Sequence, residues 1–354
     1  MSRRALITGG AGFIGSHLAG ALLERGWRVH VIDDLSTGRV RNIAAFHDRP
    51  HFRATFNSVL RADVMEPLVA DTDVVFHLAA AVGVRLIVER PVHTIATNIK
   101  STEVVLELAA KHRRAVLLSS TSEVYGKLDR AKFAESDDLV LGATSKSRWC
   151  YAASKIIDEH LALAYAREFG LPVTVLRMFN TIGPRQTGQY GMVVPRFVHQ
   201  ALAGEPLTVY GDGRQRRSFT WVGDVVDAMV ALIAHPGASG EVFNVGHTAE
   251  ITIYDLARMV KDMVGSRSDI VLVPFERAYE PGFEDMQRRL PDISKLERLI
   301  GYQPSLNLGA MLERIIADHR VMLDLAARHA ASARDQTAHA RPAPAAEQAR
   351  VAGG

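Results

Sequence analysis

Tyr151 and Lys155 have the residue types and the spacing of a proton-transferring pair. Both fall in residues 151–169, whose pattern predicts a helix, and side chains at positions i and i+4 lie on one face of a helix. A nearby ammonium favours the phenolate, so we expect Lys155 to lower the pKa of Tyr151. Such a tyrosine can act as a base toward a sugar hydroxyl. The spacing alone is common by chance, and a plain surface helix is its default interpretation.

A run of hydroxyl side chains strengthens this interpretation. Residues 119–123, with the sequence Ser-Ser-Thr-Ser-Glu, close a predicted strand at residues 115–119. A hydroxyl there, at Thr121, can share the substrate proton with Tyr151. The run and the pair together favour catalysis over a surface helix.

Three glycines near the start of the chain form a second candidate site. Gly9, Gly12 and Gly15 follow a predicted strand and precede a predicted helix. Gly9 permits a tight turn, Gly12 lets the backbone approach a pyrophosphate, and Gly15 allows close packing of helix and strand. The helix N-terminus adds free N–H groups and the positive end of its dipole. A purely structural turn is the alternative, but the strand–turn–helix context is the one that dinucleotide binding requires.

Acidic residues indicate which dinucleotide is bound. Asp33 ends the second predicted strand about 20 residues after the glycines, where a carboxylate accepts hydrogen bonds from the adenosine ribose. Because a carboxylate there repels a 2′-phosphate, NAD is favoured over NADP, although Arg39 and Arg41 follow beyond the strand tip. Asp63 and Val64 could hold the adenine, and Asp63 could equally be a helix cap.

The elements that must position these groups alternate between short apolar runs and helical patterns. This alternation is typical of βαβ units and a parallel sheet. Buried strands are expected at residues 5–8, 28–32, 74–78, 115–119 and 173–178. Helices are expected at residues 13–24, 92–111 and 151–169. Residues 1–180 therefore predict a doubly wound α/β domain that carries the cofactor site and the catalytic residues.

The second half of the chain has shorter elements separated by turns. Helices are expected near residues 195–203, 222–234 and 253–264, and a strand near residues 207–210. We expect residues 181–320 to form mainly a smaller substrate-binding lobe, segments of which can return to the main sheet. Residues 331–354 contain no aromatic residue and two prolines, and we expect a disordered tail or a helix that depends on crystal packing.

Composition excludes several other classes of protein. Of 354 residues, 47 % are hydrophobic and 23 % charged, which excludes global disorder and fibrous proteins. A net charge of +3 argues against a nucleic-acid-coating protein. The one cysteine, Cys150, excludes an intrachain disulfide and a cysteine-built zinc site, and the 14 histidines show no metal-ligand spacing. No signal peptide or membrane span is evident, so we expect a cytoplasmic protein without membrane or nucleic-acid partners.

The motifs as a set resemble the extended short-chain dehydrogenase/reductases, in particular the NAD-dependent nucleotide-sugar epimerases, dehydratases and decarboxylases. The resemblance covers residues 3–320. Beside Tyr151 and Lys155, it rests on residues 9–15 (GGAGFIG), 77–80 (HLAA), 121–126 (TSEVYG), 177–185 (RMFNTIGPR) and 211–219 (GDGRQRRSF). It implies a Rossmann-type fold and a tightly held NAD that is oxidised and reduced within one turnover. The residues it assigns to NAD are Gly9, Gly12, Phe13, Ile14, Gly15, Asp33, Asp63, Val64, Tyr151 and Lys155.

The Thr-Ser-Glu pattern bears on which reaction follows oxidation at C4 of the sugar. Related 4,6-dehydratases carry an aspartic acid where this chain has Ser122, and serine is a poor proton donor. The pattern resembles that of UDP-glucuronate decarboxylases, in which C4 oxidation makes a β-keto acid that loses CO₂. Glu123 and a neighbouring hydroxyl could orient the carboxyl group. Arg289 matches a substrate-site arginine of such decarboxylases, with a surface arginine as the alternative.

Other features keep a 4-epimerase open as the second reading. Residues 78–85 look more like epimerases and dehydratases, and Arg85 could bind a uronate carboxylate or face solvent. Asn180 and Arg217 match family positions for the substrate diphosphate, and Arg185 could bind it or anchor its own loop. UDP is favoured only by analogy.

Two further expectations concern assembly and class. The resemblance implies a homodimer formed through the helices at residues 92–111 and 151–169. A protein that senses NAD without chemistry is the non-enzymatic alternative, and the presence of Thr121, Tyr151 and Lys155 argues against it.

Overall fold

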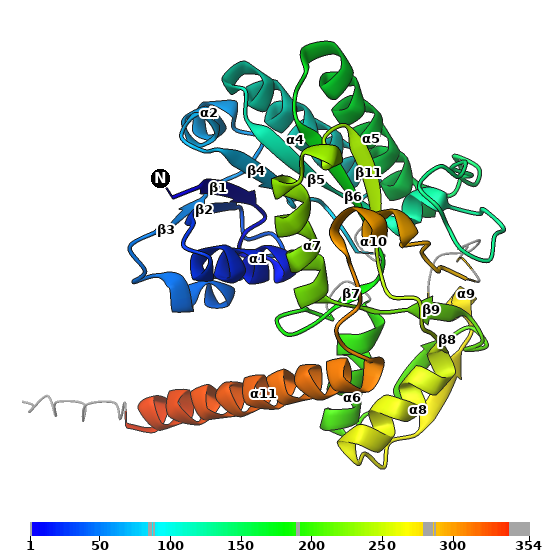
Figure 1. Ribbon diagram of the computed structural model, residues 1–354. Coiled ribbons are helices and arrows are strands. Elements are labelled where there is room, and N and C mark those ends of the chain that lie inside the picture. The colour runs from blue at the N-terminus through cyan, green and yellow to red at the C-terminus, as the bar shows by residue number, and fades with distance from the viewer. Residues whose placement is uncertain are drawn as a thin grey trace, which may run out of the picture.

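A seven-stranded parallel sheet forms the centre of the molecule (Figure 1). The computed structural model describes residues 2–83, 87, 89–188, 192–278, 286 and 288–339, with backbone alone for residues 276, 278 and 326–339. The strands lie in the order β11-β6-β5-β4-β1-β2-β3. Their bounds are β1 Arg4–Thr8, β2 Arg28–Asp33, β3 Phe52–Phe56, β4 Val74–His77, β5 Ala115–Thr121, β6 Val173–Met178 and β11 Glu241–Val245.

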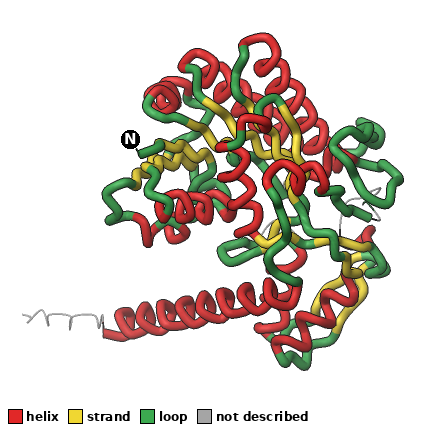
Figure 2. Tube along the Cα trace, in the orientation of Figure 1, coloured by secondary structure: helices red, strands yellow, loops and turns green. Residues whose placement is uncertain are grey.

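Helices cover both faces of this sheet, which explains why the central strands are near-continuous apolar runs (Figure 2). One face packs against α1 Phe13–Glu24, α7 Val222–Ala234 and α10 Ser294–Ile300. The other packs against α2 Ala62–Ala70, α4 Pro91–His112 and α5 Cys150–Phe169. The result is the three-layered, doubly wound arrangement that the sequence predicts.

The strand order reverses between β1 and β4, and in such sheets ligands bind at the carboxyl ends of the strands beside this switch point. The glycine loop leaves β1 there, and β5 ends there at Thr121. The topology therefore brings the two predicted sites to one edge of the sheet.

A second layer of structure lies beyond these carboxyl ends (Figure 1). It contains α6 Val193–Ala203, α8 Ile253–Val264, α11 Leu308–His339 and the parallel pair β8 Leu207–Tyr210 and β13 Ile270–Val273, which share one apolar core. Shorter elements complete it: β7 Thr181–Ile182 pairs with β10 Thr220–Trp221, β9 Arg216–Ser218 pairs with β12 Glu250–Thr252, and α9 spans Phe275–Ala278. From this layer the chain returns to the main sheet as β11.

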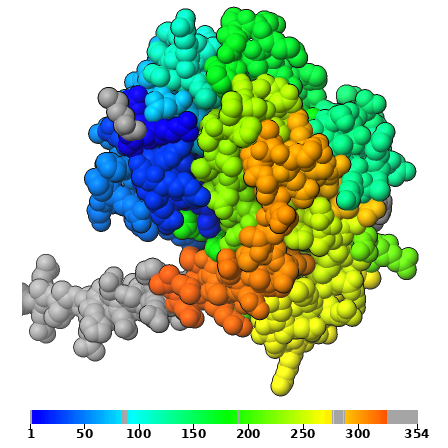
Figure 3. All heavy atoms as spheres, viewed as in Figure 1, coloured from blue at the N-terminus to red at the C-terminus, as the bar shows by residue number. Residues whose placement is uncertain are grey.

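The predicted elements all have observed counterparts, but several observed elements were not predicted. Among these are the helices α2, α10 and most of α11 and the short strands β7, β9, β10, β12 and β13. The helices predicted at residues 13–24, 222–234 and 253–264 coincide with α1, α7 and α8. The edge strands β3 and β11 were not predicted. The backbone of α11 continues to His339, so residues 331–339 are helical rather than part of a disordered tail, and residues 340–354 lie outside the described part. In Figure 1 the ribbon of α11 runs out from the body of the molecule, and Figure 3 shows its first turns, in orange, lying against the second layer.

Among the described residues, no helix is both long enough and apolar enough to cross a membrane.

Candidate active site

Thr121 and Tyr151 meet at the carboxyl end of β5. Thr121 is the last residue of β5 and caps a short 3-10 helix, Ser122–Tyr125, by accepting the backbone N–H of Glu123 at 3.2 Å. The side chains of Thr121 and Tyr151 are hydrogen-bonded to each other. Tyr151 lies in the first turn of α5 and is buried. The geometry therefore allows these two hydroxyls to share a proton, as the sequence predicts.

Glu123 stands beside this pair as a partly buried, ionised carboxylate. Arg148 Nη1 donates a hydrogen bond to its Oε2, and Arg289 Nη1 lies 3.6 Å from its Oε1. Burial alone would raise the pKa of Glu123, but the charges of Arg148, Arg289 and then Arg217 outweigh it and lower the pKa to about 2. The side chain is therefore negatively charged at neutral pH and is not a proton donor there.

Arg148 is the functional candidate that the sequence analysis missed. It lies in a short 3-10 turn, Ser147–Trp149, that leads into α5, and only 3 % of its side chain is exposed. Its guanidinium lies 5.7 Å from the centre of the Trp149 ring. The sequence feature that could have identified Arg148 is its position just before the helix that carries Tyr151. That position does not reveal a partner in the 3-10 helix that follows β5.

The expected effect of Lys155 on Tyr151 is wrong for this structure. Burial raises the pKa of the Tyr151 phenol, and the negative charges of Glu123 and Asp158 raise it further. Lys155 Nζ donates instead to Asp158 Oδ2 at 2.8 Å, and both side chains are fully buried. A carboxylate one turn further along α5 thus takes the ammonium that the spacing had assigned to the phenol.

A polar network behind the site holds the strand ends in place. Arg177 on β6 forms an ion pair with Glu159 on α5 at 2.8 Å and donates to the hydroxyl of Tyr125 at 2.9 Å. That hydroxyl in turn donates to Asn244 Oδ1 on β11 at 2.8 Å. Because all four side chains are buried, the network fixes β5, β6, β11 and α5 relative to one another.

Arg289 is buried and reaches the site from a segment near the end of the chain. Its neighbour Leu290 accepts the backbone N–H of Phe133 at 2.8 Å. Arg288 forms a bidentate ion pair with Glu250, with Nε 2.8 Å from Oε1. These contacts hold the Arg289 segment against the body, and the surface-arginine alternative is wrong because only 8 % of the Arg289 side chain is exposed.

Ser122 lies directly between Thr121 and Glu123 and is 1 % exposed. Its hydroxyl has no hydrogen-bond partner among the described residues. A buried hydroxyl without a partner is costly, so its place in the site suggests a substrate or water partner.

The glycine loop has the shape that a dinucleotide needs. Gly9 has φ +70°, and a Cβ on Gly15 would come within 2.3 Å of the Gly9 carbonyl oxygen. Gly12 caps α1 and brings no side chain, which leaves room at the first-turn N–H groups, including those of Phe13 and Ile14. The cradle therefore fits a pyrophosphate.

Asp33 is buried beside this loop. Its carboxylate accepts the backbone N–H of Ala11 at 2.9 Å and of Leu35 at 2.8 Å. Burial raises its pKa despite these hydrogen bonds. Asp33 is thus positioned by the loop and by its own turn, at the strand end where a ribose would be recognised.

The structure brings some other predicted residues close to the site and leaves others apart. Asp63 is exposed in the first turn of α2 and paired with Arg61 at 2.7 Å, while Val64 is half-buried against the sheet. Asp63 also accepts N–H groups of that turn, in keeping with the helix-cap alternative, although Arg61 occupies the N-cap position itself.

Of the residues predicted to bind the substrate phosphates, some lie close to Glu123 and others do not. Arg217 is buried and close enough to lower the pKa of Glu123, and Asn180 donates to the Ser218 carbonyl at 2.9 Å. Arg185 has φ +66°, and its backbone N–H donates to Asp318 of α11 at 3.1 Å, as a loop anchor would. Arg85 lies outside the described residues.

Comparison with known proteins agrees with this geometry. The model of the NAD dependent epimerase/dehydratase family matches residues 5–246. A UDP-N-acetyl-alpha-D-glucosaminuronate decarboxylase of Bacillus cytotoxicus is 43 % identical over 89 % of this chain and 97 % of its own. UDP-glucuronic acid decarboxylase 1 of Arabidopsis thaliana is 37 % identical over 90 % of this chain and 70 % of its own.

A solved structure shares the fold across nearly the whole chain. It is the UDP-glucuronic acid 4-epimerase of Bacillus cereus in complex with UDP-glucuronic acid and NAD. The two chains are 30 % identical, with a TM-score of 0.81 and coverage of 90 % of this chain and 99 % of the epimerase.

Proposed function

The chain belongs to the NAD-dependent epimerase/dehydratase family, and on that premise we propose that it decarboxylates UDP-glucuronate through a transient ketone at C4. The observation that carries the proposal is Glu123, held ionised by Arg148 and Arg289 beside Tyr151. Oxidation and re-reduction at C4 involve no carboxylate, whereas decarboxylation requires the substrate carboxylate to be bound and oriented, and charged side chains beside Tyr151 are suited to that. The two decarboxylases similar to this chain support the same choice.

NAD is the cofactor of this family, and the glycine cradle fits it. When bound, it supplies the acceptance and return of a hydride. We assign its pyrophosphate to the loop from Gly9 to Gly15, with Phe13 and Ile14 at the helix start, and its adenosine ribose to Asp33. Asp63 and Val64 remain our proposal for the adenine.

The first task of the protein is to take the proton of the C4 hydroxyl. Tyr151 is the base, and Thr121 shares the proton through the hydrogen bond between their side chains. Because burial keeps the phenol neutral, Tyr151 needs a cation nearby before it accepts a proton. Lys155, one turn further along α5, supplies it only by giving up the hydrogen bond to Asp158 that it makes in this structure.

The second task is to break the bond between C5 and C6. Once C4 is a ketone, the electron pair of this bond passes to C5 and the C4 oxygen as CO₂ leaves, and a proton must then return to C5. Arg289 is suited to bind the carboxylate and Ser122 to donate a hydrogen bond to it. The negative charge of Glu123 disfavours a charged carboxylate beside it, and that repulsion disappears when neutral CO₂ departs.

The remaining substrate contacts follow from the placement of the lobe. We propose that Asn180 and Arg217 contact the diphosphate and that residues 181–320 form mainly the substrate-binding lobe. Arg185 and Arg85 are weaker candidates for the same anionic substrate.

Two alternatives stand beside UDP-glucuronate decarboxylation. The relative that is 43 % identical decarboxylates the 2-acetamido uronate, which makes this sugar the second candidate substrate. The epimerase structure supports a 4-epimerase as the second candidate reaction. A 4,6-dehydratase is disfavoured because Ser122 replaces its acid, and a non-catalytic NAD sensor because Thr121 and Tyr151 are assembled.

Assembly and compartment are part of the proposal. We propose a homodimer in which α4 and α5 of each subunit meet their counterparts, since both helices carry large exposed apolar side chains, Val92, Ile95, Ile157 and Phe169. We also propose a cytoplasmic location, as expected for a chain with one cysteine.

The variant Glu123→Gln tests the proposed reaction, because it keeps the shape of the side chain and removes its charge. We expect decarboxylation of UDP-glucuronate to slow strongly, while the absorbance of NADH formed on the enzyme still appears. Glu168→Gln, on the exposed side of α5, is the matched control and should behave as the wild type. A 4-epimerase would keep its turnover within about a few-fold in the Glu123 variant, and that result would replace the proposal with the alternative.

A further inference from the structure

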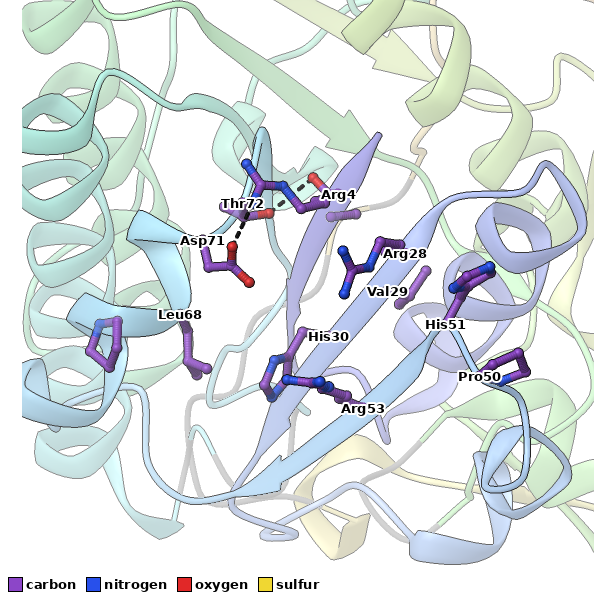
Figure 4. A pocket seen from close by; sticks show the side chains of 12 residues that line it. Arg4, Arg28, Val29, His30, Pro50, His51, Arg53, Leu68, Asp71 and Thr72 are labelled. Carbon is purple, nitrogen blue, oxygen red and sulfur yellow. Dashed lines mark hydrogen bonds and ion pairs between the residues drawn. The ribbon is translucent and has the colours of Figure 1, made fainter. Parts of the chain in front are cut away.

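A basic pocket opens at the opposite edge of the sheet from the active site. It has a volume of about 210 Å³ and lies at the amino-terminal ends of β1, β2 and β3, facing α2 (Figure 4). Arg4 and Arg28 are the first residues of β1 and β2, and Arg53 is the second residue of β3. The pocket is therefore separate from the cofactor and substrate sites, which lie at the carboxyl ends.

Strand register places like charges directly opposite each other in this pocket. Arg4 pairs with Arg28 across β1 and β2, while Arg53 on β3 stands opposite the imidazole of His30 on β2. Like charges in directly opposite positions are destabilising in a sheet. Figure 4 shows the side chains of Arg28, His30 and Arg53 pointing into the space that faces α2.

Acidic residues compensate only part of this charge. Asp71 is the one carboxylate that lines the pocket, and it is engaged by Arg4, which also contacts Asp73 at 3.4 Å. Within the described part of the chain, the side chains of Arg28 and Arg53 have no hydrogen bond or ion pair. His30 donates to or accepts from Thr55 at 2.8 Å, and burial and then the charge of Arg53 lower its pKa.

The rest of the lining is mixed, with His51 and Thr72 as polar members and several apolar side chains. Val29, Pro50, Pro67 and Leu68 form walls around the cations. A space of about 210 Å³ admits a small molecule rather than a macromolecule. We propose that this pocket binds the phosphate group of a small organic anion, with Arg28 and Arg53 as its principal ligands and the apolar walls against its organic part.

Binding of inorganic pyrophosphate tests the proposal when the active site is already filled. Calorimetry is done with saturating NAD and UDP, so that neither the glycine loop nor the substrate site is open to the probe. We expect one pyrophosphate to bind per chain and the Arg28→Ala/Arg53→Ala variant to bind it at least about tenfold more weakly, as expected for lost charge-assisted hydrogen bonds. Arg267→Ala, an exposed arginine of the lobe, should leave the affinity unchanged.

A second readout reports on the pocket itself. Burial and then the charge of Arg53 lower the pKa of His30, and an anion bound beside Arg53 offsets that charge. Pyrophosphate should therefore raise the pKa of His30, which is measured from the NMR signals of its imidazole ring. The proposal is overturned if pyrophosphate does not bind to the enzyme filled with NAD and UDP. It is also overturned if wild type and double variant bind pyrophosphate with equal affinity while their thermal midpoints are the same.

A second experiment tests whether the protein co-sediments with vesicles that contain phosphatidylserine. Co-sedimentation that depends on Arg28 and Arg53, without binding of pyrophosphate, would assign these arginines to a lipid surface instead.

Discussion

At the scale of single residues, the balance of charge around Glu123 is the feature with the clearest consequence. Its pKa of about 2 lies below the ordinary value of 4.5, so its ionised form stabilises the folded protein above about pH 4.5. That contribution is lost as the pH falls from about 4.5 toward 2. The arginines that lower the pKa of Glu123 thus also keep the site in one charge state at neutral pH.

Arg148→Met tests this balance. Without the Arg148 charge, burial should raise the pKa of Glu123, because burial is its largest single influence. The acid limb of the kcat profile should then move to higher pH, and Arg148→Lys should restore part of the shift. An acid limb at the same pH in wild type and Arg148→Met would show that Arg148 does not control Glu123.

Tyr151→Phe tests the base. We expect turnover to fall by a factor of about 10²–10⁴, since that is the usual contribution of a general base, while NAD still binds. Tyr165→Phe, further along α5, is the control and should retain turnover. Near-normal turnover of the Tyr151 variant would remove this residue from the mechanism.

The sequence predicted the site residues better than their partners. Thr121, Glu123 and Tyr151 follow from local motifs, and the structure places all three together. The Arg148–Glu123 and Lys155–Asp158 pairs were not foreseen. The first depends on how the turn that carries Arg148 packs against the 3-10 helix after β5. In the second, the carboxylate of Asp158 and the phenol of Tyr151 compete for one ammonium, and spacing alone does not decide between them.

At the scale of elements, the turn between β1 and α1 is a tight constraint on the cofactor loop. A methyl group at Gly15 would meet the Gly9 carbonyl oxygen at 2.3 Å, so the helix must shift away from the strand. The strand, the turn and the helix therefore form a single unit that presents the loop to the cofactor.

Gly15→Ala should weaken NAD binding by about tenfold or more, because overpacking of this kind costs about 1–3 kcal/mol and displaces the loop. Gly309→Ala, in the first turns of α11, is the matched control, since its added methyl group has only ordinary contacts at 3.4 Å and beyond. Calorimetric titration with NAD measures both variants. Equal affinity in Gly15→Ala and wild type would contradict the assigned role of the loop.

The two strands of the main sheet that escaped prediction share a physical cause. β3 and β11 lie at the two edges of the sheet and carry exposed residues, so neither reads as a continuous apolar run. Helices with a regular apolar face, such as α8, were predicted with their observed bounds. Hydrophobic periodicity therefore identified strands that are continuous apolar runs and helices that have a regular apolar face. It missed the edge strands, because their exposed residues interrupt the apolar pattern.

At the scale of the whole molecule, the exposed apolar side chains of α4 and α5 bear on assembly. Ile157 is 47 % exposed, and a charge at this position would be buried in the proposed dimer interface. Ile157→Glu should therefore shift the protein from dimer to monomer in sedimentation equilibrium. Val321→Glu, on the projecting part of α11, should remain dimeric. A wild-type monomer, or a dimeric Ile157 variant, would contradict an interface on these helices.

The mass of the product formed from UDP-glucuronate tests the central claim most directly. Purified wild-type protein with NAD is incubated with this sugar nucleotide, and the product is separated and measured by mass spectrometry. The proposed mechanism predicts a pentose or 4-keto-pentose nucleotide that has lost the carboxyl carbon, together with release of CO₂. A product of unchanged mass and altered retention, the C4 epimer, would contradict decarboxylation and establish the epimerase alternative.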